Sequence, residues 1–285
     1  MSLVSLVLAT YGRSDDVRRM LDSLTMQTDT NFELLIVDQN PDERLQKHIA
    51  YGQASGLNIR HLRLAPPSLS GARNFGIALA RGEIVGLPDD DCWYEPETVA
   101  RVRHAFAQES SIDGLAGNWV EQVEASGSAS PTGRLSYAEW RQFQGKNASS
   151  ITLFFRRQLF ECLGGFDERL GVGKWYGAAE ETDFILRALA SNARLDYCPM
   201  VKVHHVFTLN SRASLLASCR AMRRRGRGTG AIYAKHRMSC FVILRGILGQ
   251  VIRPFLEGKL RDVVIGASVS LGLLEGFLKW QCWER

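Results

Sequence analysis

Three consecutive aspartates close the stretch Gly82-Glu83-Ile84-Val85-Gly86-Leu87-Pro88-Asp89-Asp90-Asp91. The apolar run from Ile84 to Leu87 has the composition of a buried strand, so the aspartates fall where that strand ends. Adjacent carboxylates repel one another and are costly to desolvate, and a divalent cation compensates for both effects. The stretch therefore predicts an oxygen-ligand site for Mg²⁺ or Mn²⁺ that would hold a diphosphate, with a solvated acidic turn as the alternative.

The sequence around this stretch alternates short apolar runs with helix-like segments, which is typical of βαβ units and a parallel sheet. Predicted strands cover 3–9, 32–37, 59–64 and 84–87, and predicted helices cover 14–26, 42–54, 71–80 and 96–108. In such sheets, ligands bind beyond the carboxyl ends of the strands. Three polar segments fall at those ends, so we expect one ligand to contact all of them: 10–13, 38–40 and 89–91.

The rest of the chain changes character twice. Residues 125–133 are small and turn-forming, which predicts a loop at one edge of the sheet. Predicted strands cover 151–156 and 195–204, and predicted helices cover 158–163 and 180–192. After about residue 210 the composition becomes basic and then apolar, which predicts a C-terminal helical extension.

The composition is that of an ordinary globular protein, with 285 residues, 45% of them hydrophobic and 23% charged. The net charge of +5 is uneven, because residues 197–256 contain eleven Lys or Arg and no Asp or Glu. This stretch favours an anionic partner such as lipid, phosphate or nucleic acid. The cysteines form no CxxC pair and no basic leader opens the chain, so we expect reduced thiols and no signal peptide. We also expect no membrane-spanning helix, since no run reaches roughly 20 uncharged apolar residues.

Six segments, taken in order, resemble the motifs of the inverting family 2 glycosyltransferases, whose nucleotide-sugar domain has the GT-A fold. They cover about residues 3–205 and are 4–13 (VSLVLATYGR), 32–38 (FELLIVD), 70–76 (SGARNFG), 82–91 (GEIVGLPDDD), 164–168 (GGFDE) and 180–184 (EETDF). The resemblance implies an α/β fold with a mostly parallel, Rossmann-like sheet flanked by helices. It also implies a catalytic domain over 1–210, with a nucleotide-binding half over about 1–110 and an acceptor-binding half over 111–210. The helical extension then covers 211–285.

The implied reaction is a metal-dependent transfer of a sugar, with inversion, from a nucleotide-diphosphate donor to a glycan or lipid-linked glycan in surface polysaccharide synthesis. Mn²⁺ or Mg²⁺ would stabilise the charge on the leaving diphosphate. Asp91, with Asp89 beside it, resembles the family's metal motif, and Asp90 is then expected to reach the ribose or donor sugar. His205 is expected to complete the metal shell. His204 is the alternative, because adjacent side chains on a strand point to opposite faces.

The resemblance also implies a set of donor-binding residues. Thr10, Tyr11 and Arg13 would form a wall for the nucleoside and phosphate, or else a simple strand-to-helix turn. Arg73 and Asn74 lie at the start of a predicted helix, where free backbone N–H groups favour anions, and would support the diphosphate and nucleoside. The alternative for Arg73 is a solvated surface position.

The choice of nucleotide depends on the end of the second predicted strand. By resemblance, Asp38 faces the nucleoside. Gln39 stands where many relatives have a second Asp that contacts the base, so the base contact departs from the family pattern. A glutamine amide both donates and accepts, and so it could read the imide edge of uracil or thymine. We therefore favour a UDP-sugar among the possible donors.

The base of an inverting displacement removes a proton from the acceptor hydroxyl. Glu181 resembles the family's base position, although Glu replaces the commoner Asp. Asp183 is then an orienting carboxylate, because i and i+2 do not share a helix face, and Glu180 precedes both. The alternative is that these acids only favour a helix N-terminus. Trp175 and Tyr176 would stack on a sugar ring or pack in the core.

The C-terminal third combines a basic run over 220–227 with apolar helices over 241–256 and 263–283. This combination suits an anionic membrane surface, core packing or a homodimer interface. We expect a cytoplasmic protein, with peripheral attachment to the inner face of the membrane left open. An alternative enzyme is a sugar-nucleotide nucleotidyltransferase, which would carry a glycine-rich loop after the first strand. A nucleic-acid-binding protein is the non-enzyme alternative, but the basic run lacks interleaved aromatics and we expect no nucleic acid partner.

Overall fold

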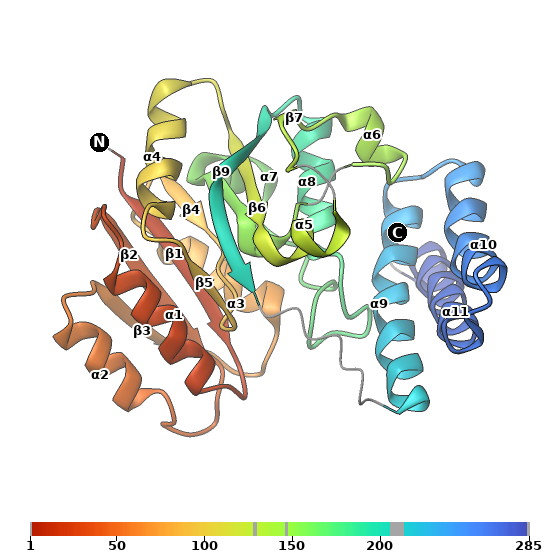
Figure 1. Ribbon diagram of the computed structural model, residues 1–285, viewed down its shortest axis with the longest axis horizontal. Helices are drawn as coiled ribbons and strands as arrows, with labels where there is room; N and C mark the ends of the chain where they lie inside the picture. The colour runs from red at the N-terminus through yellow and green to blue at the C-terminus, as the bar shows by residue number, and fades with distance from the viewer. Residues whose placement is uncertain (1, 128–129, 146–147, 206–213, 284–285) are drawn as a thin grey trace. The chain divides into compact units, whose positions relative to one another are not determined.

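The computed structural model describes residues 2–127, 130–145, 148–205 and 214–283 (Figure 1). The chain divides into two compact units. The sheet unit comprises Met1–Ser136, Gly145–Gly165 and Arg187–Phe207, and the helical unit comprises Tyr137–Gln144, Phe166–Leu186 and Thr208–Arg285. The segment Phe166–Leu186 therefore clusters with the C-terminal helices, although it precedes the last strand in the sequence.

One mixed sheet of nine strands forms the centre of the sheet unit. The strands are β1 (Val4–Thr10), β2 (Phe32–Asp38), β3 (Ile59–Arg63), β4 (Ile84–Gly86), β5 (Cys92–Tyr94), β6 (Gly114–Trp119), β7 (Gly133–Arg134), β8 (Leu153–Arg156) and β9 (Leu195–His205). Their order is β3-β2-β1-β4-β8-β6-β9-β5, and β7 pairs with β9. Strands β1 to β4 are parallel to one another, so all four end at one edge of the sheet. The predicted α/β class with flanking helices is confirmed.

Helices cover both faces of this sheet. The helical segments that the structure describes in the sheet unit are α1 (Asp15–Thr25), α2 (Gln46–Ala54), α3 (Leu69–Leu79), α4 (Thr98–Gln108), α5 (Val120–Ser126), the short 3-10 turn η1 (Ser150–Thr152) and α7 (Arg157–Leu163). Helix α1 buries Val17, Met20, Leu21 and Leu24 at helical spacing in the same cluster as Leu6. Each such fully buried side chain stabilises the fold by about 1.5–3 kcal/mol. Helices α2 and α4 join this cluster.

The opposite face carries α3. A Cβ at Gly76 would lie only 2.3 Å from a Val7 methyl group, so the helix backbone approaches β1 as closely as glycine allows. The close approach fixes where α3 begins relative to the ends of β1 and β2. It therefore also fixes the position of Arg73, one turn earlier on the same helix.

Strand β6 and helix α5 were not predicted from the sequence. Gly114 and Gly117 of β6 allow close packing, since a Cβ would lie 2.4 Å from Phe155 and 2.5 Å from the Val201 carbonyl oxygen respectively. Helix α5 ends at Ser126, within the stretch 125–133 that was expected to be a loop, and Gly127 caps it with a φ of 61°.

The helical unit is formed by α9 (Leu215–Lys235), α10 (Cys240–Leu256) and α11 (Leu260–Trp283), with the short α6 (Tyr137–Arg141). Helix α8 (Glu180–Ala190) begins in this unit and ends in the sheet unit. Helices α9 and α11 touch through their backbones, since a Cβ at Gly272 or Gly276 would lie 2.2 or 2.0 Å from a carbonyl oxygen of α9. The expected C-terminal helical extension is confirmed (Figure 1).

Part of the basic run serves this packing. Arg223 and Arg227 both bind Glu275 of α11, Arg227 at 2.8 Å. Helix α11 is also long and apolar enough, by length and composition, to cross a membrane over Leu260–Cys282, which corrects the expectation that no such segment exists. Its most apolar window is 39% buried against the rest of the chain, and the core helix of a soluble protein can pass the same test of length and composition.

Candidate active site

The three polar segments expected at the strand ends meet in the structure. Thr10 and Asp38 are register partners at the ends of β1 and β2, and Ala9 forms a parallel bridge to Asp89. The Thr10 hydroxyl donates a 2.7 Å hydrogen bond to Asp90. The parallel sheet thus gathers side chains that are up to 80 residues apart in the sequence.

Cations surround the aspartate triplet. Arg13 reaches Asp90 with Nε at 3.2 Å and Asp91 with Nη1 at 2.5 Å. The third aspartate, Asp89, binds Arg73, which is only 1% exposed; Arg73 Nη2 lies 2.8 Å from Asp89 Oδ1. Arg73 is therefore a buried, ion-paired residue, and the alternative of a solvated surface position is wrong. The three carboxylates are therefore compensated by protein cations from two elements, Arg13 from the loop after β1 and Arg73 from helix α3.

His205 is the histidine that meets the triplet. Strands β5 and β9 are antiparallel and pair Cys92 with His205, which places the imidazole Nε2 2.9 Å from Asp91 Oδ1. His204 points to the other face, where Nδ1 lies 2.8 Å from Glu121 and the ring stacks on Trp93. Of the two histidines, the structure thus sets His205 beside the carboxylate.

The pKa values of Asp90 and Asp91 are shifted in opposite directions. Burial dominates for Asp90 and raises its pKa to about 6. Burial would also raise the pKa of Asp91, but the hydrogen bond and charge of His205 and the charge of Arg13 outweigh it and hold that pKa below its ordinary value. The surroundings of Asp91 therefore favour its ionised form more than those of Asp90 do.

Asp38 is saturated with donors. It accepts hydrogen bonds from the Asn40 backbone N–H at 2.9 Å and side-chain amide at 2.8 Å, and it lies 2.9 Å from His61 and 2.8 Å from Arg63. Burial alone would raise its pKa, but these donors outweigh burial and lower it. The neighbouring Gln39 accepts from the Ser68 N–H at 2.6 Å, so its amide carbonyl is already engaged.

His61 and Arg63 were not predicted as site residues, whereas Asn40 belongs to the segment 38–40 that was expected to contact the ligand. His61 and Arg63 are two residues apart near the carboxyl end of β3, so their side chains lie on the same face. This i, i+2 spacing of polar residues was the signal available in the sequence. Asn40 also accepts a 2.6 Å hydrogen bond from the N–H of Gly12, whose φ of 80° suits glycine. This bond joins the loop after β1 to the loop after β2. Tyr11, in the first of these loops, is 56% exposed.

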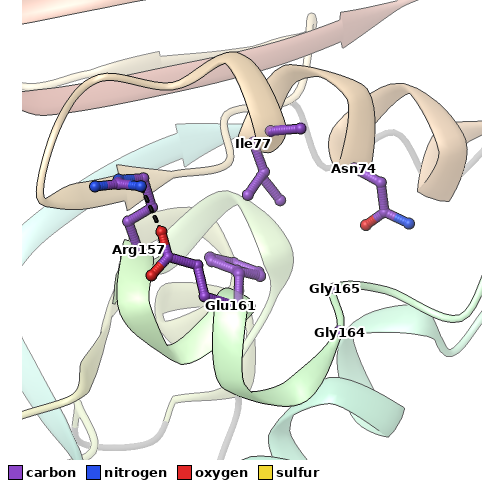
Figure 2. Close-up of a pocket in the computed structure, with 8 residues that line it drawn as sticks. Asn74, Ile77, Arg157, Glu161, Gly164 and Gly165 are labelled. Carbon is purple, nitrogen blue, oxygen red and sulfur yellow. Dashed lines mark hydrogen bonds and ion pairs between the residues drawn. The ribbon is translucent and has the colours of Figure 1, made fainter.

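Asn74 is separated from its neighbour Arg73. It lines a cavity of about 350 Å³ beside α7 and the turn at Gly164 and Gly165 (Figure 2). Figure 2 shows the Asn74 amide facing that turn, with the ion pair of Arg157 and Glu161 farther along the wall. A Cβ at Gly165 would lie 2.7 Å from the Asn74 amide oxygen, which explains the second glycine of the turn. Asn74 thus shapes this turn, while Arg73 binds Asp89.

The acidic turn belongs to the helical unit. Glu180 is 4% exposed and Asp183 is fully buried, whereas Glu181 is partly exposed. Asp183 Oδ1 lies 2.8 Å from Lys235 Nζ and 2.8 Å from His236 Nε2. These two side chains, from the last residue and the C-cap of α9, hold the first turn of α8 that presents Glu181.

The same Lys235 reaches a second carboxylate, Asp167, at 2.6 Å. Arg169 binds Asp167 as well, at 2.7 Å. Burial would raise the pKa of Asp167, but these two cations outweigh burial and hold it well below its ordinary value. Lys235 therefore joins the Gly-Gly-Phe-Asp turn to the start of α8.

The two aromatic residues before α8 have different environments. Tyr176 is 2% exposed and packs against Trp280 in the core of the helical unit. Trp175 is 39% exposed, with Arg227 and Lys279 within 4.4 and 4.2 Å of its ring. Of the pair, Trp175 is the one with surface open to a sugar.

No cluster of three or more His, Cys, Asp or Glu side chains is arranged to hold a metal in the part of the chain that the structure describes. Asp91 and His205 are instead a pair of hard-to-borderline donors side by side. Two protein ligands fit a cation that takes its remaining ligands from water and phosphate, as Mg²⁺ usually does.

Comparison with known proteins identifies the family. The family model described as Glycosyl transferase family 2 matches residues 5–164, which is more than half of the chain. The chain belongs to this family. An uncharacterized glycosyltransferase of Haemophilus influenzae is 30% identical over 113 residues, 39% of this chain and 37% of that protein. The putative glycosyltransferase EpsH of Bacillus subtilis is 31% identical over 130 residues, 44% of this chain and 36% of that protein.

A longer match, at 26% identity over 195 residues, is to a PGL/p-HBAD biosynthesis glycosyltransferase of Mycobacterium bovis, covering 67% of this chain and 71% of that protein. Among solved structures, the mannosyltransferase PcManGT of Pyrobaculum calidifontis, in complex with GDP-Man and Mn²⁺, has a TM-score of 0.69 at 14% identity and covers 100% of this chain and 88% of that one. Staphylococcus aureus TarS 1–349, in complex with UDP-GlcNAc, has a TM-score of 0.57 at 18% identity, with 94% and 90% coverage. These likenesses confirm the GT-A type of fold.

Proposed function

We propose that this family 2 protein transfers a sugar, with inversion, from a nucleotide-diphosphate donor to a glycan or lipid-linked glycan acceptor. The observation that carries the proposal is the convergence of three strand ends on one charged site. The loop after β1, the saturated Asp38 after β2 and the triplet after β4 lie at the edge of a parallel sheet where nucleotides bind. A surface-polysaccharide product and a cytoplasmic location at the inner face of the membrane are part of the same proposal.

The donor would lie along the edge formed by β1 and β2. Arg13 has the reach to exchange a carboxylate for a phosphate, since its side chain is 42% exposed. The Gln39 carbonyl is engaged by Ser68, which leaves the amide N–H groups as the part of the side chain able to face a base. We favour a UDP-sugar, since uracil carries carbonyl oxygens that accept from such a donor. The solved neighbours bind GDP-Man in one case and UDP-GlcNAc in the other.

Metal dependence is a further part of the proposal. Asp91 and His205 would hold Mn²⁺ or Mg²⁺, with Asp89 kept nearby by Arg73. The cation would neutralise charge that develops on the leaving diphosphate. Thr10 orients Asp90, which would accept a hydrogen bond from a hydroxyl of the ribose or sugar. Mn²⁺ accompanies GDP-Man in PcManGT.

Glu181 is proposed as the base that takes the proton of the acceptor hydroxyl. Its neighbours support this role by exclusion: Glu180 is buried and Asp183 is engaged by Lys235 and His236. Glu181, in the same turn, is the more exposed acid. Trp175 would offer its open edge to the acceptor.

A nucleotide screen tests the proposal. Melting temperature is measured with UDP, GDP, dTDP and ADP, each with and without Mn²⁺, followed by transfer assays with the stabilising nucleotide's sugars. We expect stabilisation by UDP that increases with Mn²⁺, because a ligand that binds only the folded state raises its stability by mass action. Absence of stabilisation by any of these nucleotides, with or without the metal, would contradict the proposed function.

A further inference from the structure

Helix α10 exposes an apolar face. The side chains on this face recur at helical spacing, and each is about half exposed or more: Phe241 67%, Leu244 56%, Leu248 52%, Ile252 49%, Phe255 66% and Leu256 79%. The groove along the face has a volume of about 630 Å³. A contiguous apolar surface of this kind marks an interaction site far more often than isolated exposed residues do.

The fold does not require this face. The opposite side of α10 already packs into the core of the helical unit, where Val242 is 1% exposed and Ile243 and Ile247 are partly buried. A Cβ at Gly246 would lie 2.2 Å from the Tyr233 hydroxyl, so that side is in close contact with α9. Helix α10 is thus apolar on two sides, and only one of them is used within the chain.

The charges around the face are positive. Helix α10 contains Arg245 and Arg253 and no Asp or Glu, and both arginines line the groove. One acid, Glu257, also lines the groove, but it lies 3.0 Å from Arg253 and 2.7 Å from Lys259, so the charge around the face is net positive. Across 208–285 the sequence has fourteen Lys or Arg against four Asp or Glu.

We propose that the outer face of α10 docks on an anionic lipid bilayer, with the helix lying in the plane of the interface. Leucine and phenylalanine side chains enter the boundary between headgroups and acyl chains, while Arg245 and Arg253 meet lipid phosphates. A second copy of the chain fits this face less well, because a two-fold contact would bring the same arginines against each other.

Vesicle flotation of the full-length protein tests the proposal without any donor or acceptor, so it can fail while the proposed sugar transfer stands, and the reverse. Vesicles of phosphatidylcholine with phosphatidylglycerol are compared with phosphatidylcholine alone. The test variant carries Leu244→Ser, Leu248→Ser and Ile252→Ser. The matched control carries Met26→Ser, Val172→Ser and Met200→Ser, which are 67%, 62% and 57% exposed and lie outside α10.

We expect the wild type to float with anionic vesicles only. The α10 variant should bind at least about tenfold more weakly, whereas the control should bind like the wild type. Arg253→Gln, at a side chain that is 85% exposed, should weaken binding about fivefold, and Arg134→Gln, at 62% exposed, should not. Circular dichroism and melting temperature confirm that all variants are folded.

Four results would overturn the proposal. Equal binding of the wild type and the α10 variant would remove the face from the interaction. Equal binding to neutral and anionic vesicles would remove the role of charge. A wild-type dimer that the α10 variant turns into a monomer, without vesicle binding, would assign the face to a second copy. Association that survives high salt and alkaline extraction would mean that α11 is inserted in the bilayer rather than that α10 lies on it.

Discussion

Two clusters of buried acids, one in each unit, are compensated in different ways. In the sheet unit, Asp90 and Asp91 are met by Arg13 and His205, whose side chains are 42% and 22% exposed. Arg13 approaches from a loop on a long, flexible side chain. A cation held in this manner can be displaced when a competing ligand arrives, at little cost to the fold.

In the helical unit, Asp167 and Asp183 are met by Lys235 and His236, whose side chains are only 20% and 12% exposed. Both side chains come from the last turn and cap of α9, a helix of 21 residues. Their positions are set by the helix, and solvent has little access to replace them. This cluster joins α8 to α9 within the unit.

The difference teaches how to separate a ligand site from a structural joint when both are rich in carboxylates. The contrast rests on the cation that two acids share in each cluster: Arg13 is 42% exposed, and Lys235 is 20% exposed. Changing the aspartate cluster of the sheet unit should therefore cost function and little stability. Changing the cluster of the helical unit should cost stability first.

The largest effect is expected for Lys235→Met. This change leaves Asp167 and Asp183 without their shared cation, and removal of one partner from a buried ion pair costs about 3–5 kcal/mol of unfolding free energy. Chemical denaturation at neutral pH measures it. Lys259→Met, at an exposed pair with Glu257, is the control and should change the unfolding free energy by less than about 1 kcal/mol. Similar losses for both would remove the distinction between the clusters.

The next effect concerns the acid that the helical cluster positions. Glu181→Gln should lower the rate of sugar transfer about 10²–10⁴-fold, the usual contribution of a general base, with donor affinity and melting temperature unchanged. Asp183→Asn, two residues away and fully buried, is the matched comparison and should lower the melting temperature as well. Transfer at the wild-type rate by Glu181→Gln would refute its role as base.

The smallest effect is expected for Arg13→Gln. Loss of this half-exposed guanidinium should weaken UDP binding about tenfold, because one charge-assisted hydrogen bond to phosphate is removed, and should leave the melting temperature of the ligand-free protein nearly unchanged. Calorimetric titration with UDP measures the affinity. A large drop in melting temperature would mean that Arg13 is a structural cation like Lys235.

Much of the sheet unit could be predicted from the sequence because its signals are local. Strands β1 and β2 are buried at every position and end at the polar residues Thr10 and Asp38. Asp89 follows soon after the buried strand β4. Strand β6 was not predicted because its glycines are explained by distant contacts rather than by local propensity. Gly114 packs closely on Phe155, 41 residues away, and Gly117 on Val201, 84 residues away.

The partners of the site were harder to predict than its acids. Lys235 and His236 lie 52 and 53 residues beyond Asp183, and neither has a sequence signal that points to α8. Their contacts depend on how α9 packs within the helical unit. Arg73 was predicted near the start of a helix, and in the structure it is the fifth residue of α3. Its near-complete burial against Asp89 could not be predicted.

The most direct test of the exchangeable site is Mn²⁺ binding in the presence of UDP, followed by electron paramagnetic resonance or calorimetry. The wild type is compared with Asp91→Asn and with Asp22→Asn, whose carboxylate lies 2.9 Å from Arg18 on the surface of α1. We predict that Asp91→Asn weakens UDP-dependent Mn²⁺ binding by about tenfold or more while Asp22→Asn binds as the wild type does. Equal Mn²⁺ affinity in all three proteins would contradict the assignment of Asp91 as a metal ligand.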